Sequence, residues 1–179
     1  MYSKSTMNIK ENSAYYMFGL HAVKAAIKNP NRKKHELWIS QNARAKIFSD
    51  YEIPNIPIFN LDKSKNLPIS ENKVHQGAIL KVSPLRQPSD IHEIHKSEQP
   101  KLIIILDKVS DPQNVGAIIR TFSFFGGENL LITKDHSSEI NGSLAKSASG
   151  ALESVNIIKV TNLSMTLKKI RKKGFTIIG

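Results

Sequence analysis

The chain has 179 residues and carries 26 Lys and Arg against 15 Asp and Glu, for a formal net charge of +11. This excess favours a polyanionic partner, with nucleic acid first, although a basic surface without such a role stays an alternative. Hydrophobic residues make up 40% of the chain, which is enough for a packed core. Cysteine is absent, which excludes disulfides and zinc–thiolate sites and favours a cytoplasmic setting. No apolar run approaches membrane-spanning length, so we expect no membrane partner.

The first half of the chain alternates helical and strand patterns. Residues 1–14 are polar and predict a flexible tail. Helices are expected over 19–28 and 43–51, and strands over 36–40, 56–59 and 77–82. The alternation predicts a small three-layer α/β unit over residues 15–84. Residues 85–99 form a polar stretch bounded by prolines and predict a linker.

The second half predicts a parallel sheet with helices on both faces. The apolar run 102–106 is typical of a parallel strand that is covered on each side. A helix over 115–125 follows, with Asn114 as its cap, and later patterns predict strands at 130–132 and 155–160 and helices at 143–150 and 163–173. The final run 175–178 indicates the next strand of the same sheet. We therefore expect the chain to end inside this domain.

One short segment carries the strongest chemical signal. Residues 111–114 lie at the carboxyl end of the first predicted parallel strand, where open α/β sheets place their ligands. Gly116 would let a ligand approach the first helical turn, whose N–H groups can bind an anion. Arg120 lies on the flank of the helix with small residues one turn below it. An ordinary strand–turn–helix with a solvated arginine remains the alternative, because spacing alone does not decide.

The string LDKVSDPQNVGAIIR at 106–120 resembles the first signature motif of the SpoU (TrmH) family of RNA 2′-O-methyltransferases. The resemblance extends through 134–138, 146–155 and 160–163, and backward to 19–23 and 74–77. It is similar above all to the subgroup that methylates a guanosine ribose in large-subunit ribosomal RNA. The implied fold class is α/β, with an L30e-like substrate-binding domain at 15–84 and the N-terminal part of a SPOUT (α/β knot) domain at 100–179.

The resemblance also implies site residues and a cofactor. It places Asn114 and Arg120 in the catalytic site and makes S-adenosyl-L-methionine the methyl donor. The family's knot, cofactor loops and dimer region are expected beyond Gly179. We therefore assign no cofactor-binding residue, and we expect this chain alone neither to bind the cofactor nor to methylate RNA. The resemblance also implies a homodimer, but its usual dimer region is expected beyond Gly179.

The chemistry of the arginine narrows its role. A ribose 2′-hydroxyl must lose its proton as it attacks the sulfonium methyl group. A guanidinium, with a pKa above about 12, is a poor proton acceptor. We therefore expect Arg120 to stabilise the developing alkoxide and to hold a phosphate, while Asn114 orients the loop.

Further RNA contacts are predicted less directly, at positions that match the family or form a basic run: His21, His75, Gln76, Lys168, Lys169 and Arg171. Capping, packing or a solvated helix face is the alternative for each. His92 and His95 do not indicate a metal site, since an isolated pair on a polar segment is usually surface. Ser143, Ser147 and Ser149 lack the partners that serine hydrolysis needs.

Four functions remain open at this point. The first is an S-adenosylmethionine-dependent ribosomal RNA ribose methyltransferase, with transfer RNA as a possible substrate. The second is a non-catalytic RNA-binding remnant, and the third is one half of a split enzyme. A structural ribosomal-type RNA binder is the fourth, but it does not explain Asn114 and Arg120 in a methyltransferase motif.

Overall fold

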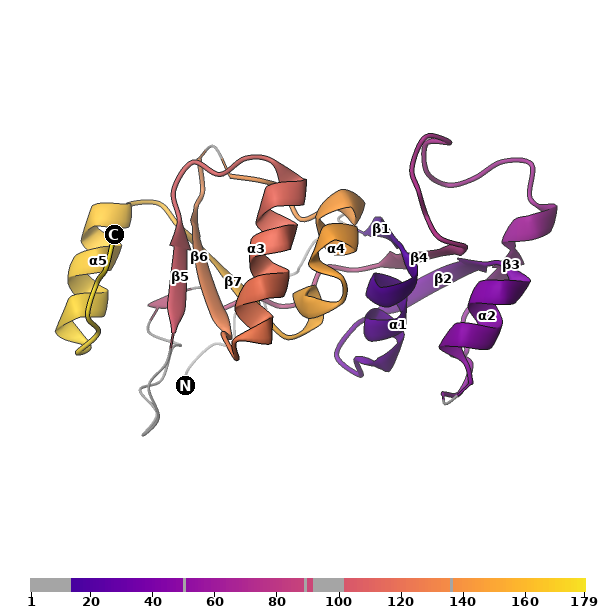
Figure 1. Cartoon of the computed structure of the whole chain (residues 1–179), viewed down its shortest axis with the longest axis horizontal. Coiled ribbons are helices and arrows are strands. Elements are labelled where there is room, and N and C mark those ends of the chain that lie inside the picture. Colours follow the sequence, from indigo (N-terminus) through magenta and orange to yellow (C-terminus); the bar gives the residue numbers. More distant parts are fainter. Residues whose placement is uncertain (1–13, 50, 89, 92–101, 136) are drawn as a thin grey trace, which may run out of the picture.

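The computed structural model describes residues 14–49, 51–88, 90–91, 102–135 and 137–179. Two sheets lie side by side along the molecule, with helices between them (Figure 1). The first sheet holds four strands in the order β1-β4-β2-β3, and the second holds three in the order β5-β6-β7. This mixed α/β architecture confirms the fold class expected from the sequence.

The first sheet is mostly antiparallel. Its strands are β1 (Tyr15–Phe18), β2 (Lys34–Ile39), β3 (Ile58–Asn60) and β4 (Ala78–Val82), and only β2 and β3 run parallel. Helices α1 (Leu20–Lys28) and α2 (Gln41–Ile47) follow β1 and β2 and bury their apolar side chains in one core with this sheet. The sequence patterns did not predict β1, because its four residues show no alternation and the strand is defined by its pairing with β4.

The second face of this sheet is covered by a loop. The short helix η2 (Leu61–Lys63) and the residues after it place Leu61, Leu67 and Ile69 against Phe18 and Ile79. The predicted three-layer unit therefore differs from the structure in its third layer, which consists of the short helix η2 and a loop instead of an α-helix.

The second sheet is entirely parallel, as the continuous apolar runs predicted. Strands β5 (Ile103–Leu106), β6 (Asn129–Thr133) and β7 (Asn156–Val160) send alternate side chains to opposite faces. Leu130 and Ile157 pack with α3 (Pro112–Phe124) and α4 (Gly142–Ala148). Leu131 and Ile158 pack on the other face with α5 (Leu163–Lys172).

The predicted last strand is not formed. The backbone N–H of Phe175 donates to the carbonyl of Ile170 at 3.4 Å, which ties the segment to the end of α5. Phe175 packs on the cluster beneath α5, whereas Ile178 is 92% exposed. The run at 175–178 therefore stays beside α5 and pairs with none of the described strands.

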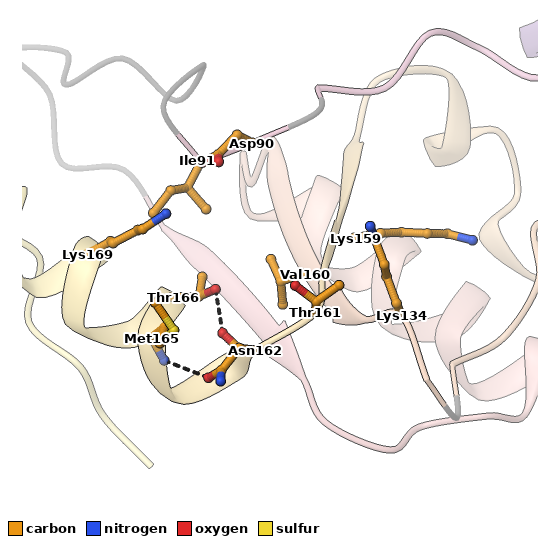
Figure 2. Close-up of a pocket in the computed structure, with 10 residues that line it drawn as sticks. All are labelled: Asp90, Ile91, Lys134, Lys159, Val160, Thr161, Asn162, Met165, Thr166 and Lys169. Atoms are coloured by element: carbon orange, nitrogen blue, oxygen red, sulfur yellow. Dashed lines mark hydrogen bonds between the residues drawn. The ribbon is translucent and has the colours of Figure 1, made fainter.

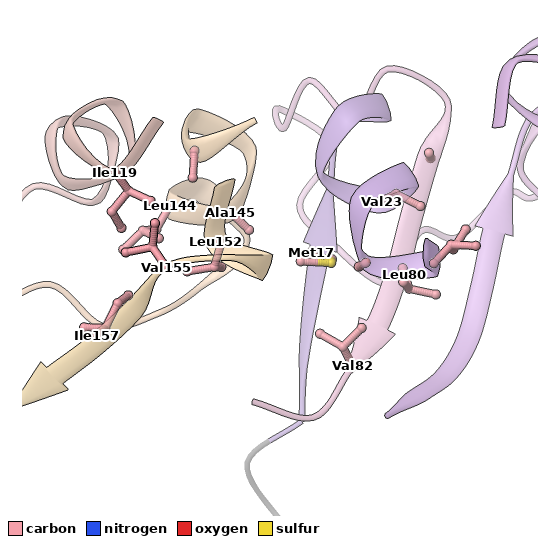
Figure 3. Packing of buried hydrophobic residues seen from close by; sticks show 14 of the residues in the cluster. Met17, Val23, Leu80, Val82, Ile119, Leu144, Ala145, Leu152, Val155 and Ile157 are labelled. Atoms are coloured by element: carbon pink, nitrogen blue, oxygen red, sulfur yellow. The ribbon is translucent and has the colours of Figure 1, made fainter. Parts of the chain in front are cut away.

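One hydrophobic core joins the two sheets. Met17 and Val82 of the first sheet belong to the same buried cluster as Leu144 of α4 and Leu152 of the short helix η4 (Ala151–Glu153). Figure 3 shows the two groups facing each other across the junction. A Cβ added to Gly142 would lie 2.3 Å from the Tyr16 carbonyl oxygen, so α4 lies directly on β1. The two halves are therefore packed against each other.

Candidate functional site

Helix α3 begins earlier than its sequence pattern predicted. The Asp111 side chain accepts hydrogen bonds from the backbone N–H groups of Gln113 (3.3 Å) and Asn114 (3.2 Å), and Pro112 occupies the first helical position. Proline suits that position because its fixed φ is helical and no N–H is needed there. The expectation that Asn114 caps the helix is therefore wrong. Its side chain is left exposed in the first turn of α3.

The small residue in the first turns of α3 serves helix packing. A Cβ on Gly116 would lie 2.6 Å from both the Leu144 carbonyl oxygen and the Ser147 Cβ. The close neighbour of Gly116 is thus α4, and the ligand approach expected from the sequence is wrong. The contact also lets the Ser147 hydroxyl donate to the Gln113 carbonyl at 2.8 Å. Helices α3 and α4 therefore pack closely together and form one wall of the site.

That wall faces a cavity at the junction of the two halves. The cavity has a volume of about 380 Å³ and is lined by residues from α3, α4, β1 and the loop before β4: Phe18, Asn72, Lys73, Val74, Gln113, Arg120, Ser143, Lys146 and Ser147. Arg120 therefore lies where both halves of the chain meet. Asn114 does not line this cavity, so the structure does not bring the two predicted catalytic side chains together there.

The junction cavity is cationic. Lys73, Arg120 and Lys146 contribute three positive charges, and none of the nine lining residues carries a carboxylate. The Lys73 ammonium lies 3.4 Å from the Ser143 hydroxyl, to which it donates. Such a cavity suits a phosphate or another anion.

Sequence reasoning missed the two lysines of this cavity. Lys73 lies in a loop without a periodic pattern, so nothing local distinguished it. Ser143, Lys146 and Ser147 are spaced at i, i+3 and i+4, which places them on one face of the predicted helix. That spacing is the signal that would have grouped them.

A buried ion pair fastens the two halves elsewhere along the junction. Arg32 donates to Glu153 through Nη2 at 2.6 Å and Nε at 3.1 Å, and the two side chains are only 1% and 8% exposed. Asn29 adds a hydrogen bond of 2.9 Å to the same carboxylate. Burial raises the pKa of the neighbouring Tyr15 hydroxyl and lowers the pKa of the Lys34 ammonium. These contacts of Arg32 and Asn29 with Glu153, called the seam below, join the two halves that line the cavity.

Two of the three predicted RNA-binding residues of the first half have structural partners. Gln76, at φ +53°, accepts a hydrogen bond from the Leu20 N–H at 3.1 Å and so helps α1 to begin. The His75 Nδ1 accepts from the Gly77 N–H at 3.1 Å. His21 is exposed on α1. His75 and Gln76 follow the loop that lines the cavity but do not line it themselves.

The basic run of α5 lies on the other face of the second sheet. Lys168, Lys169 and Arg171 are exposed there. Lys169 also lines a separate cavity of about 290 Å³ at the carboxyl ends of β6 and β7, together with Lys134 and Lys159 (Figure 2). In that view, Lys159 extends away from α5, so the three ammonium groups do not converge.

At three cavities of the described residues, no lining combines a carboxylate with an aromatic side chain, which is the combination that would suit S-adenosylmethionine. The cofactor carries a sulfonium cation and an adenine ring. The cavity at β6 and β7 is lined by three lysines and one carboxylate, Asp90, and by no aromatic side chain that could stack on adenine. The junction cavity is cationic as well. A third cavity, of about 440 Å³ beside the Arg32–Glu153 pair, has Arg86, Glu153 and no aromatic residue in its lining.

Two other kinds of site find no support in the described part of the chain. No group of three or more His, Cys, Asp or Glu side chains is arranged there to hold a metal ion. The two linker histidines, His92 and His95, lie outside the described residues. Within the same ranges, no helix has the length and apolar character needed to cross a membrane.

Comparison with known proteins assigns a family to both halves. A profile of the SpoU rRNA methylase family matches residues 101–179, and a profile for RNA 2′-O ribose methyltransferase substrate binding matches residues 16–88. The 23S rRNA (guanosine-2′-O-)-methyltransferase RlmB of Ralstonia nicotianae is 33% identical over 168 residues, which cover 91% of this chain and 68% of that protein. RlmB of Escherichia coli K12 is 30% identical over 176 residues, which cover 91% of this chain and 70% of that protein.

Solved structures share the fold. A TrmH-family protein from Porphyromonas gingivalis superposes with a TM-score of 0.66 at 22% identity and covers 91% of this chain. AviRb from Streptomyces viridochromogenes, in complex with AdoMet, superposes with a TM-score of 0.64 at 17% identity and covers 92%. The chain spans 61% and 62% of the length of these two proteins. The two matching profiles and the identity to the RlmB proteins show that the chain belongs to the SpoU rRNA methylase family.

Proposed function

We propose that this chain binds RNA and activates the ribose in an S-adenosylmethionine-dependent 2′-O-methyltransferase that acts on a guanosine of large-subunit ribosomal RNA. The observation that carries the proposal is the position of Arg120. It lies in a cationic cavity that the methylase region and the substrate-binding region form together. The names of the RlmB relatives supply the substrate class.

The cavity can perform the part of the reaction that concerns the ribose. An alkoxide that develops at the 2′-oxygen is stabilised by a fixed cation within hydrogen-bond reach. Arg120 supplies that cation, and its helix is held in place by the contact of Gly116 with α4. Asn114, exposed in the first turn, remains a proposed catalytic residue that would orient the substrate strand.

A chimera tests the proposal. This chain would replace the matching 70% of the E. coli relative, and methyl transfer to ribosomal RNA would be measured with labelled S-adenosylmethionine. We expect Arg120→Ala to lower kcat by at least ~10²-fold while cofactor affinity stays nearly unchanged, because one charge-stabilising group is lost. Lys172→Ala, an exposed change on α5, serves as the control. Wild-type turnover by Arg120→Ala would refute the catalytic role.

RNA binding without catalysis is the second candidate. It is favoured by the junction cavity, whose three cationic side chains and lack of a lining carboxylate suit an anion. The chimera separates the candidates. Methyl transfer by the chimera would favour the enzyme, whereas RNA binding by the 179-residue chain together with an inactive chimera would favour the binding module.

A further inference from the structure

We propose that Lys73 and Lys146 hold one phosphodiester group of the RNA between the two halves of the chain, beside the ribose that faces Arg120. The identification of the anion as RNA rests on the proposed function. The placement of the two lysines in one cavity, one from each half of the chain, rests on the structure alone.

The two lysines line one cavity but come from different halves of the chain. Lys73 belongs to the loop before β4 in the first half, and Lys146 belongs to α4 in the second half. The Lys73 ammonium reaches Ser143, which lies one turn before Lys146 on α4. A phosphodiester has two non-bridging oxygens, so it can accept a hydrogen bond from each lysine at once. No lining carboxylate competes for either lysine.

Local packing fixes the stem of Lys146. A Cβ on Gly19 would lie 3.1 Å from the Lys146 Cγ, and Gly19 has φ +99°, which disfavours other residues. The stem of Lys146 is therefore packed against the backbone of the first half, and Lys146 is only partly exposed. A lysine whose stem is ordered loses less conformational entropy when its ammonium group binds an anion.

The remaining lining favours a nucleotide over a free anion. Val74 lines the cavity and is 65% exposed, whereas Phe18 is only 4% exposed. The apolar surface of Val74 can pack on a sugar or a base, whereas inorganic phosphate would leave it in water. The volume of about 380 Å³ is also larger than a single phosphate group needs.

The site exists only while the two halves are docked. Its two lysines reach the cavity because α4 packs on β1 and because Arg32 and Glu153 pair across the same junction. A bound phosphodiester would add a third link between the halves.

The salt dependence of RNA binding tests whether Lys73 and Lys146 bind the same phosphate. The 179-residue chain and its Lys73→Gln, Lys146→Gln and double variants would be titrated by fluorescence anisotropy with a labelled fragment of large-subunit ribosomal RNA over a range of KCl. Each single variant should bind at least ~5-fold more weakly and lower the slope of log K against log [KCl] by up to ~0.9, the value for one lost phosphate contact. If both lysines hold the same phosphate, the double variant should lose little more than either single variant.

Several outcomes would overturn the proposal. Additive losses, with a slope that falls by up to ~1.8, would mean two independent phosphates. Unchanged affinity in the Lys73 and Lys146 variants would mean that these lysines are only solvated. The control variant Lys172→Gln is expected to keep its affinity. Displacement of the RNA by millimolar inorganic phosphate would mean that the site takes a free anion. Thermal melting of every variant checks that a loss of affinity is not a loss of folding.

The binding assay contains no cofactor, so its failure differs from failure of the proposed function. Non-additive loss of RNA affinity together with an inactive chimera would support the phosphate site and refute the methyltransferase function. An active chimera whose KM for RNA is unchanged by Lys73→Gln would support the function and refute the phosphate site.

Discussion

The junction between the two halves contains two groups of charges that differ in burial and in pairing. In the seam, Arg32 and Glu153 are almost fully buried and joined by two hydrogen bonds, with further bonds from Arg32 to the Ser83 carbonyl and from Asn29 to the carboxylate. In the cavity, Lys73 and Arg120 are exposed, and no lining carboxylate pairs with them. Both regions join the same two halves of the chain.

The difference follows from the cost of removing a charge from water. A buried charge is tolerated only with a well-placed partner, so the seam is fully paired. An exposed ammonium or guanidinium is stabilised by water and can remain unpaired until an anion arrives. The seam therefore maintains the docking of the halves, and the cavity provides the binding site.

Removing one member of the seam should have the largest effect on stability. Glu153→Ala would leave Arg32 buried without a carboxylate, which costs roughly 3–5 kcal/mol of the free energy of unfolding. The measurement is urea unfolding followed by circular dichroism. The matched control is Lys81→Met, which removes the more exposed 3.9 Å pair with Glu36 and should cost at most about 1 kcal/mol. Equal losses in the two variants would contradict the contrast between seam and surface.

Pushing α3 and α4 apart should have the next largest effect on stability. Gly116→Ala adds a methyl group 2.6 Å from the Leu144 carbonyl and must push α3 and α4 apart. Overpacking of this kind costs about 1–3 kcal/mol, which outweighs the gain in helix propensity of up to ~1 kcal/mol. Chemical unfolding and RNA affinity should both be affected, since the wall carries Arg120. A gain in stability would show that the helices can separate freely.

Tyr16 on β1 provides a third test of how burial and pairing affect stability, because its contribution depends on pH. Partial burial and a hydrogen bond to the Glu36 carboxylate raise the pKa of Tyr16 from its ordinary value of 10.0 to about 12. Because the folded state holds the proton more tightly, this contribution to stability is fully present below about pH 10 and is lost as the pH rises through about 12. Tyr16→Phe should therefore flatten the stability curve in that range. Tyrosinate absorbance that rises completely near pH 10 would contradict the shift.

Arg120 should have the smallest effect on stability. Its side chain is exposed and has no paired carboxylate in the cavity, so Arg120→Ala should change the free energy of unfolding by less than ~0.5 kcal/mol. Circular dichroism and urea unfolding check this directly. A loss comparable to that of Glu153→Ala would make Arg120 a structural residue like those of the seam.

Much of the second half could be predicted from the sequence. The run at 102–106 predicted a parallel strand covered on both faces, and the structure has β5 at Ile103–Leu106. The apolar spacing of α5 placed its start at Leu163 as observed. By contrast, β1 and the fate of residues 175–178 depend on pairing partners elsewhere in the chain, which a local pattern does not encode.

The sequence by itself determined the family, the alternation of helices and strands, and the presence of Arg120 in a recognisable motif. These properties are local: hydrophobic periodicity follows from the geometry of each element, and a motif is read along the chain. Only the tertiary structure decided that Lys73, Arg120 and Lys146 share one cavity and that Arg32 meets Glu153 across 121 positions of sequence. Such contacts arise when the two halves dock, because close approaches at Gly116 and Gly142 position α4 between them.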